Sequence, residues 1–161
     1  MNASATNTSG MTAPQPIDPK WIGHELPPSV LPIERTRIRF FAKAIGATDP
    51  IYTDVGAAQA AGYPDLVAPP TFLFAAELDS GAIDSLLDDL GIPLPKLLHG
   101  EQGFTWYKSV CAGDTVTVHS RITDIYAKKG GALEFVVKQS RVVDQNDKLV
   151  AELRSILVVR H

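Results

Sequence analysis

The chain has 161 residues and a formal net charge of −3, with 45% hydrophobic and 20% charged residues. This is the balance of an ordinary soluble domain with a substantial core, and the acidic charge argues against a nucleic-acid or anionic-membrane partner. Cys111 is the only cysteine, so no internal disulfide can form. No apolar run approaches the ~20 residues of a membrane span and the start lacks a signal-peptide pattern. We therefore expect a reducing compartment and a cytoplasmic protein.

The first 20 residues differ in composition from the rest of the chain. They are rich in Ala, Ser, Thr, Asn and Pro and contain almost no large apolar residue, so we expect residues 1–20 to form a flexible tail. Residues 21–161 then make a single domain. Three prolines between His24 and Pro32 permit only a short edge strand near residues 29–31.

Residues 34–45 have the pattern of an amphipathic helix. Four apolar residues recur at helical spacing: Ile38, Phe41, Ala42 and Ile45. Four basic residues occupy the other side: Arg35, Arg37, Arg39 and Lys43. We interpret the basic set as a solvated helix face, with a rim that attracts a phosphate-bearing carrier as the alternative.

A turn and two more helices are expected next. The Asp49-Pro50 step predicts a turn, and a short helix over residues 55–61 has Asp54 as its N-cap. Proline suits a first helical position, so we expect a helix to begin at Pro70. Residues 71–78 contain only one charge, Glu77, which predicts a helix buried on all sides. Apolar spacing over residues 83–90 predicts a further helix that ends at a glycine.

The second half of the chain has the two-residue period of strands. Segments 102–108, 115–122, 133–138 and 149–159 are separated by short polar or glycine-containing turns. In the third segment, Leu133, Phe135 and Val137 alternate with Glu134 and Lys138. Four consecutive strands with short connections predict an antiparallel meander. A helix buried against such a sheet is an α+β domain.

Several motifs together resemble the MaoC-like dehydratase and hydratase family, and most of all its FAS1-type N-terminal dehydratase domains. The motifs are FAKAIGATDPIY, AAGYPDLVAPPTF and LHGEQGFTWYKSVCAGDTVTV. The resemblance implies a hotdog fold, in which an antiparallel sheet wraps a central helix, and dimers that form through sheet edges. It also implies acyl thioesters of CoA or acyl carrier protein as ligands, and reversible addition of water to a 2-enoyl bond.

The sequence departs from this family where the family keeps its catalytic residues. Members carry an Asp and a His in a G-D-x-N-P-x-H turn. Here Ala47 stands at the Asp position, Asp49 at the Asn position and Tyr52 at the His position. Members also carry His-Gly where this chain has Pro69-Pro70, and a proline has no N–H to donate to a thioester oxygen.

Three interpretations of this departure stay open. The chain is a non-catalytic partner of a catalytic MaoC-like paralogue in a heterodimer, or it is an active homodimer that uses other groups, or it is an acyl-CoA thioesterase. The candidate catalytic residues for an active homodimer are Asp49, Tyr52 and His99, since such groups serve as acid or base. The candidate substrate-binding residues are Pro70, Thr71, Glu101 and Gln102. For Gln102, the resemblance implies a place on the strand that lines the acyl site.

Each candidate also has a structural interpretation. An Asp before Pro is often a turn former, Tyr52 could be a core aromatic, and His99 could serve packing. Cys111 lacks a neighbouring activating residue in the sequence, so we expect no nucleophilic role. The sequence contains no Cys/His cluster and no glycine-rich phosphate loop, so we expect neither a metal nor another cofactor.

Overall fold

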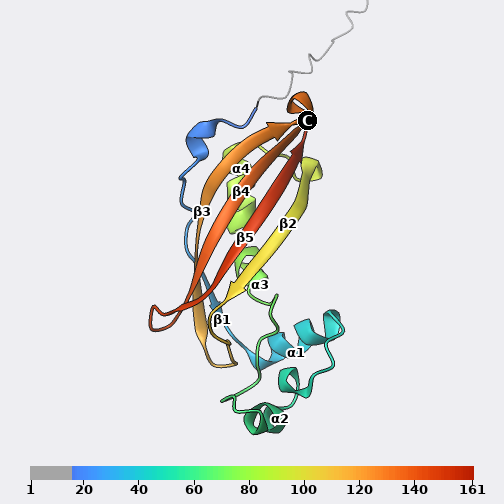
Figure 1. The fold of residues 1–161 in the computed structure, drawn as a ribbon, viewed down its shortest axis with the longest axis vertical. Helices are drawn as coiled ribbons and strands as arrows, with labels where there is room; N and C mark the ends of the chain where they lie inside the picture. Colours follow the sequence, from blue (N-terminus) through green and yellow to red (C-terminus); the bar gives the residue numbers. More distant parts are fainter. Residues whose placement is uncertain (1–15) are drawn as a thin grey trace, which may run out of the picture.

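The computed structural model describes residues 16–161, and it shows a curled antiparallel sheet with two short helices against its inner face (Figure 1). The order of the strands is β1-β3-β4-β5-β2. Their bounds are β1 Ser29–Pro32, β2 Leu97–Trp106, β3 Thr115–Lys128, β4 Leu133–Asp144 and β5 Leu149–Arg160. The α-helices are α1 Arg35–Ala44, α2 Val55–Ala60, α3 Phe74–Asp79 and α4 Ala82–Leu90. The 3-10 turns are η1 Pro19–Trp21, η2 Pro50–Tyr52, η3 Leu94–Lys96 and η4 Lys129–Gly131.

The strand order confirms an antiparallel α+β domain but corrects the predicted meander. β3, β4 and β5 are consecutive neighbours, whereas β2 pairs with β5 on the far side of the sheet. The segment between β2 and β3 is not a tight turn, because Cys111 in its middle forms a bridge with Val67 and is buried. β2 also begins five residues earlier than predicted. A register shift between His99 and Glu101 interrupts the two-residue period there.

The central helix is shorter than the sequence indicated. Pro70 is exposed and non-helical, and hydrogen bonds such as Phe72 N to Pro69 O and Ala75 N to Phe72 O form tight turns before α3 begins at Phe74. The helix is also not buried on all sides, because Leu78 is 53% exposed. A left-handed glycine, Gly81 with φ 69°, separates α3 from α4.

The two N-terminal helices confirm the predicted patterns, with small corrections. Asp54 caps α2, since its Oδ1 accepts a hydrogen bond from Ala57 N at 2.6 Å. Ile45 is half exposed because it follows the end of α1. The basic face of α1 is not simply solvated. Three of its arginines contact other segments: Arg35 pairs with Asp65, Arg37 pairs with Asp79, and Arg39 donates to Thr53 O.

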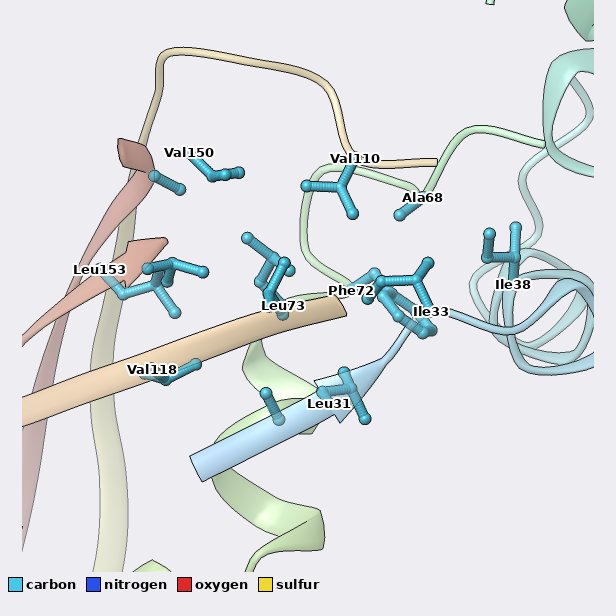
Figure 2. Close-up of a cluster of buried hydrophobic side chains, with 14 of the residues drawn as sticks. Leu31, Ile33, Ile38, Ala68, Phe72, Leu73, Val110, Val118, Val150 and Leu153 are labelled. Atoms are coloured by element: carbon cyan, nitrogen blue, oxygen red, sulfur yellow. The ribbon is translucent and has the colours of Figure 1, made fainter. Parts of the chain in front are cut away.

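Two apolar clusters form the core on the inner side of the sheet. The lower cluster lies at the end of the sheet near α1 and includes Leu31, Ile38, Phe72, Leu73, Val118 and Leu153 (Figure 2). The upper cluster packs against α4 and includes Ile17, Leu86, Leu87, Ile122, Val136 and Leu157.

The end of the predicted tail is part of this packing. Ile17 is buried in the upper cluster, and its N–H donates to the Glu134 carboxylate at 3.0 Å. The packed part of the chain therefore begins before residue 21. The first fifteen residues of the predicted tail lie outside the described residues.

Candidate functional site

In the turn that stands at the position of the family's catalytic motif, both candidate residues make structural contacts. Asp49 is exposed and caps η2, since its Oδ1 accepts from Ile51 N at 3.1 Å. Tyr52 is half-buried and packs against the lower cluster. The carboxylate thus satisfies a backbone N–H, and the aromatic ring belongs to the core.

Two of the candidate substrate-binding residues, Pro70 and Thr71, lie just before α3. Pro70 and Thr71 are both exposed, whereas the next two residues, Phe72 and Leu73, are buried in the lower cluster. Thr71 lies three residues before α3, so its N–H is part of a turn and not of a helix N-terminus.

His99 is held by contacts from the helix and from the sheet. Its ring stacks on Phe74, the first residue of α3, with ring centroids 5.0 Å apart and an interplanar angle of 25°. His99 Nε2 lies 3.2 Å from Gln102 Oε1, which also accepts from Ser155 Oγ at 2.6 Å. Glu101 is exposed and pairs with Arg154 at 2.8 Å. The structure thus brings His99 and Gln102 into contact, and Glu101 forms a surface ion pair.

The candidate residues fall into two groups within one chain. Figure 1 places η2 between α1 and α2 at one end of the molecule, whereas β2 begins near the opposite end. Among residues 16–161, no hydrogen bond or ion pair joins Asp49 or Tyr52 to His99 or Gln102. A single chain does not assemble these groups into one acid–base set.

An apolar groove of about 340 Å³ lies between α1 and α3. It is lined by Thr36, Arg37, Phe40, Phe41, Phe72 and Ala75. Phe40 is 76% exposed and contributes an apolar side chain to the lining of the groove. The groove lies beside the Pro69–Leu73 turn, because Phe72 belongs to both.

The outer face of the sheet holds a second, larger cavity of about 760 Å³. Outward-facing residues of four strands line it, among them Thr105, His119, Arg121, Arg141, Glu152 and Arg154. His119 is exposed. The lining combines three arginines, Arg121, Arg141 and Arg154, with two glutamates, Glu25 and Glu152.

The sequence analysis missed a buried ion pair. Lys138 Nζ lies 2.5 Å from Glu77 Oε1, and both side chains are at most 2% exposed. Along β4, the charged residues Glu134 and Lys138 are both buried, whereas the apolar residues Leu133 and Phe135, which alternate with them, are half-buried. The one usable signal was the presence of a single charge, Glu77, in an otherwise apolar run, since such a charge requires a partner.

Three further observations concern the Cys111 thiol, a metal site and membrane-spanning helices. Cys111 is buried, and this burial raises the pKa of its thiol, which agrees with the absence of a nucleophilic role. Among residues 16–161, no group of three His, Cys, Asp or Glu side chains converges as a metal site. Within the same range, none of the helices has both the length and the apolar character needed to cross a bilayer.

A curled antiparallel sheet around a central helix defines a hotdog fold. A family model described as "FAS1-like, dehydratase domain region" matches residues 20–153, and the chain belongs to this family. Similar proteins include UPF0336 protein Lxx02810 of Leifsonia xyli subsp. xyli, which is 39% identical over 148 residues, 90% of this chain and 97% of the relative.

Two solved structures from Mycobacterium tuberculosis have the same fold. One is the C-terminally truncated HadBC (3R-hydroxyacyl-ACP dehydratase) complex, with a TM-score of 0.74 and 24% identity over 86% of this chain and 96% of that chain. The other is the ChsH1-ChsH2 complex, with a TM-score of 0.64 and 26% identity over 85% of this chain and 89% of that chain.

Proposed function

We propose that this chain is the acyl-binding, non-catalytic subunit of a two-chain hydratase or dehydratase. Its substrates would be enoyl or (3R)-hydroxyacyl thioesters of CoA or acyl carrier protein. The observation that carries the proposal is the use of the motif positions: Asp49 caps a turn and Tyr52 packs into the core. Water addition needs an acid–base pair that holds one water between its members. Both residues have structural contacts in this chain, and no acid–base pair is formed between them among residues 16–161.

The turn before α3 supports the same conclusion. Stabilising the thioester oxygen requires an N–H directed at it, and Pro70 stands where the family has the glycine that supplies one. The acid–base pair and one oxyanion donor are therefore missing together. This combination is expected of a subunit whose partner carries the catalytic residues.

The groove between α1 and α3 supports a retained acyl site. Phe40, Phe41, Phe72 and Ala75 give it an apolar lining, and burying a CH₂ group of a ligand in such a lining contributes about 0.8 kcal/mol. The groove begins beside the turn in which the thioester would lie. A tail that enters at Thr71 would therefore meet apolar side chains at once.

The free edge of β2 supports a partner subunit. Among residues 16–161, β2 pairs with β5 on one side only, and an unpaired strand edge is a template for another strand. Leu98 on this strand is 45% exposed. The HadBC and ChsH1-ChsH2 structures are complexes of two different chains, and a MaoC-like paralogue with an intact Asp/His turn would be the corresponding partner here.

An active homodimer is the second candidate, and His99 favours it. His99 is exposed at the edge strand and hydrogen-bonded to Gln102, so a second copy could bring its own Asp49 and Tyr52 toward it. His99→Ala would then abolish turnover by the chain alone. Release of free CoA by the chain alone would instead support a thioesterase.

Calorimetry with a saturated acyl-CoA tests acyl binding directly. The wild-type chain should bind, and Ala75→Trp should lose at least about tenfold in affinity, about 1.4 kcal/mol, because the indole would fill the groove. Ala44→Trp, an exposed position of α1, is the matched control and should bind as wild type does. Equal binding by wild type and Ala75→Trp, or no binding by wild type, would remove the proposed acyl site.

A further inference from the structure

A belt of polar side chains crosses the inner face of the sheet between the two apolar clusters. Along each of four strands, the inward-facing residues change from apolar to polar and back to apolar. In β3, for example, Val118 belongs to the lower cluster and Ile122 to the upper cluster, and Ser120 lies between them. The residues of this polar belt are Gln102, Ser120, Lys138, Ser140 and Ser155.

Glu77 of α3 meets the centre of the polar belt. Its Oε1 lies 2.5 Å from Lys138 Nζ and accepts hydrogen bonds from Ser120 Oγ, at 3.1 Å, and from Ser140 Oγ. Burial lowers the pKa of Lys138, and the carboxylate beside it opposes that shift. A buried ion pair of this kind gives little net stability, but it does select one geometry.

The rotation of α3 about its axis follows the ion pair and not the apolar side chains. Glu77 is 1% exposed, whereas its neighbour Leu78 is 53% exposed. Successive helical residues differ by about 100°, so a rotation by one position would bury Leu78 and expose Glu77, as apolar burial alone would favour. The only buried apolar residue of this six-residue helix is Ala76, which is too small to set the rotation by packing.

Two series of contacts connect Glu77 with His99, one along α3 and the other across the polar belt of the sheet. Through the helix, Glu77 lies one turn from Phe74, whose ring stacks on His99. Through the sheet, Lys138 is the cross-strand neighbour of Ser155, which donates to Gln102, and Gln102 contacts His99. These connections, through side chains and through the backbone of α3 and of the paired strands, lead from Glu77 to His99 at the exposed edge.

We propose that Glu77 and Lys138 are positioning residues, which fix the rotation of α3 on the sheet and so hold Phe74 against His99 and keep Leu78 outward. The proposal does not depend on the acyl-binding function. Both of its readouts are structural, so a failure to bind acyl-CoA would leave it standing.

The test uses the ring protons of His99 in NMR spectra of the full chain. Stacking on Phe74 shields these protons, and Phe74→Ala defines the unshielded shift. Lys138→Met leaves the Glu77 carboxylate buried without its cation, so the helix should rotate to bring Glu77 to solvent, and the His99 signals should move toward the Phe74→Ala values. Glu77→Gln combined with Lys138→Gln keeps hydrogen-bonding groups and should restore the wild-type shifts.

Thiol labelling at position 78 provides the second readout. In a Cys111→Ser background, Leu78→Cys should react rapidly when the ion pair is intact, and severalfold more slowly when Lys138→Met leaves Glu77 without its cation and the helix rotates. Lys108→Met, which breaks an ion pair elsewhere, is the control and should change neither readout. Unchanged His99 shifts and labelling in the folded Lys138→Met variant would overturn the proposal. If that variant does not fold, unchanged shifts in Ser120→Ala/Ser140→Ala would overturn it.

Discussion

Single residues at the candidate positions make contacts that their type alone does not reveal. Asp49, which stands at the family's Asn position, caps Ile51 N with its Oδ1. His99 lies near the start of β2, and its ring contacts Phe74 and Gln102. A residue type is visible in the sequence, whereas its hydrogen-bond partner depends on the folded chain.

Gly100 in β2 leaves almost no room for a side chain. A Cβ at this position would lie 2.6 Å from Val158 Cγ2 and 3.2 Å from Ile156 O, and the glycine occupies the register shift next to His99. Gly100→Ala should therefore lower the free energy of unfolding by about 1–3 kcal/mol, the usual cost of overpacking. Denaturant unfolding measures this change.

Gly103 on the same strand is the matched control. Its nearest neighbour to an added Cβ is Arg154 O at 3.8 Å, so Gly103→Ala should leave stability unchanged or raise it, since Ala loses less backbone entropy than Gly. Equal destabilisation by both substitutions would show that close packing at Gly100 is not the cause.

At the scale of whole elements, the sequence correctly predicted the features that depend on residues close together in the chain. The helical spacing in α1 and the Asp54 cap of α2 are set within a few residues, and both are confirmed. The burial of Lys138 in β4 could not be read from the alternation of its residues, because Lys138 is buried against a partner 61 positions away in the sequence, Glu77. The order of the strands also depends on long-range pairing, so β2 could not be placed beside β5.

The end of β4 is tied to the segment after β2 by a further ion pair. Lys108 Nζ lies 2.8 Å from Asp144 Oδ2, and this hydrogen bond, with those from Asn146 N and Lys148 N, lowers the pKa of Asp144 to about 2. A carboxyl with a lowered folded-state pKa adds stability above its unfolded value of ~3.9 and loses it as the pH falls. The contribution is thus complete at pH 7 and disappears between about pH 4 and pH 2.

Lys108→Met should therefore lower the free energy of unfolding at pH 7, and its difference from wild type should shrink below pH 4. Urea unfolding at a series of pH values measures this difference. Lys43, an exposed lysine of α1 without an ion pair among the described residues, supplies the control, and Lys43→Met should show no such dependence. A Lys108→Met deficit that stays constant down to pH 2 would contradict this account.

At the scale of the whole molecule, the fold was predictable and the site only in part. An antiparallel sheet around a central helix followed from strand patterns and from motifs that resemble the MaoC-like family, and the structure confirms it. The groove between α1 and α3 was not predictable, since its lining comes from segments some 30 residues apart. The residues that would complete an acid–base set are not joined within one chain, which makes assembly with a second subunit the central question.

Incubation of the purified chain alone with crotonyl-CoA and with longer enoyl-CoAs tests the central claim most directly. The account predicts no hydration above the uncatalysed rate, because Asp49 and Tyr52 serve the fold and Pro70 offers no N–H. Rapid hydration by the chain alone would contradict it.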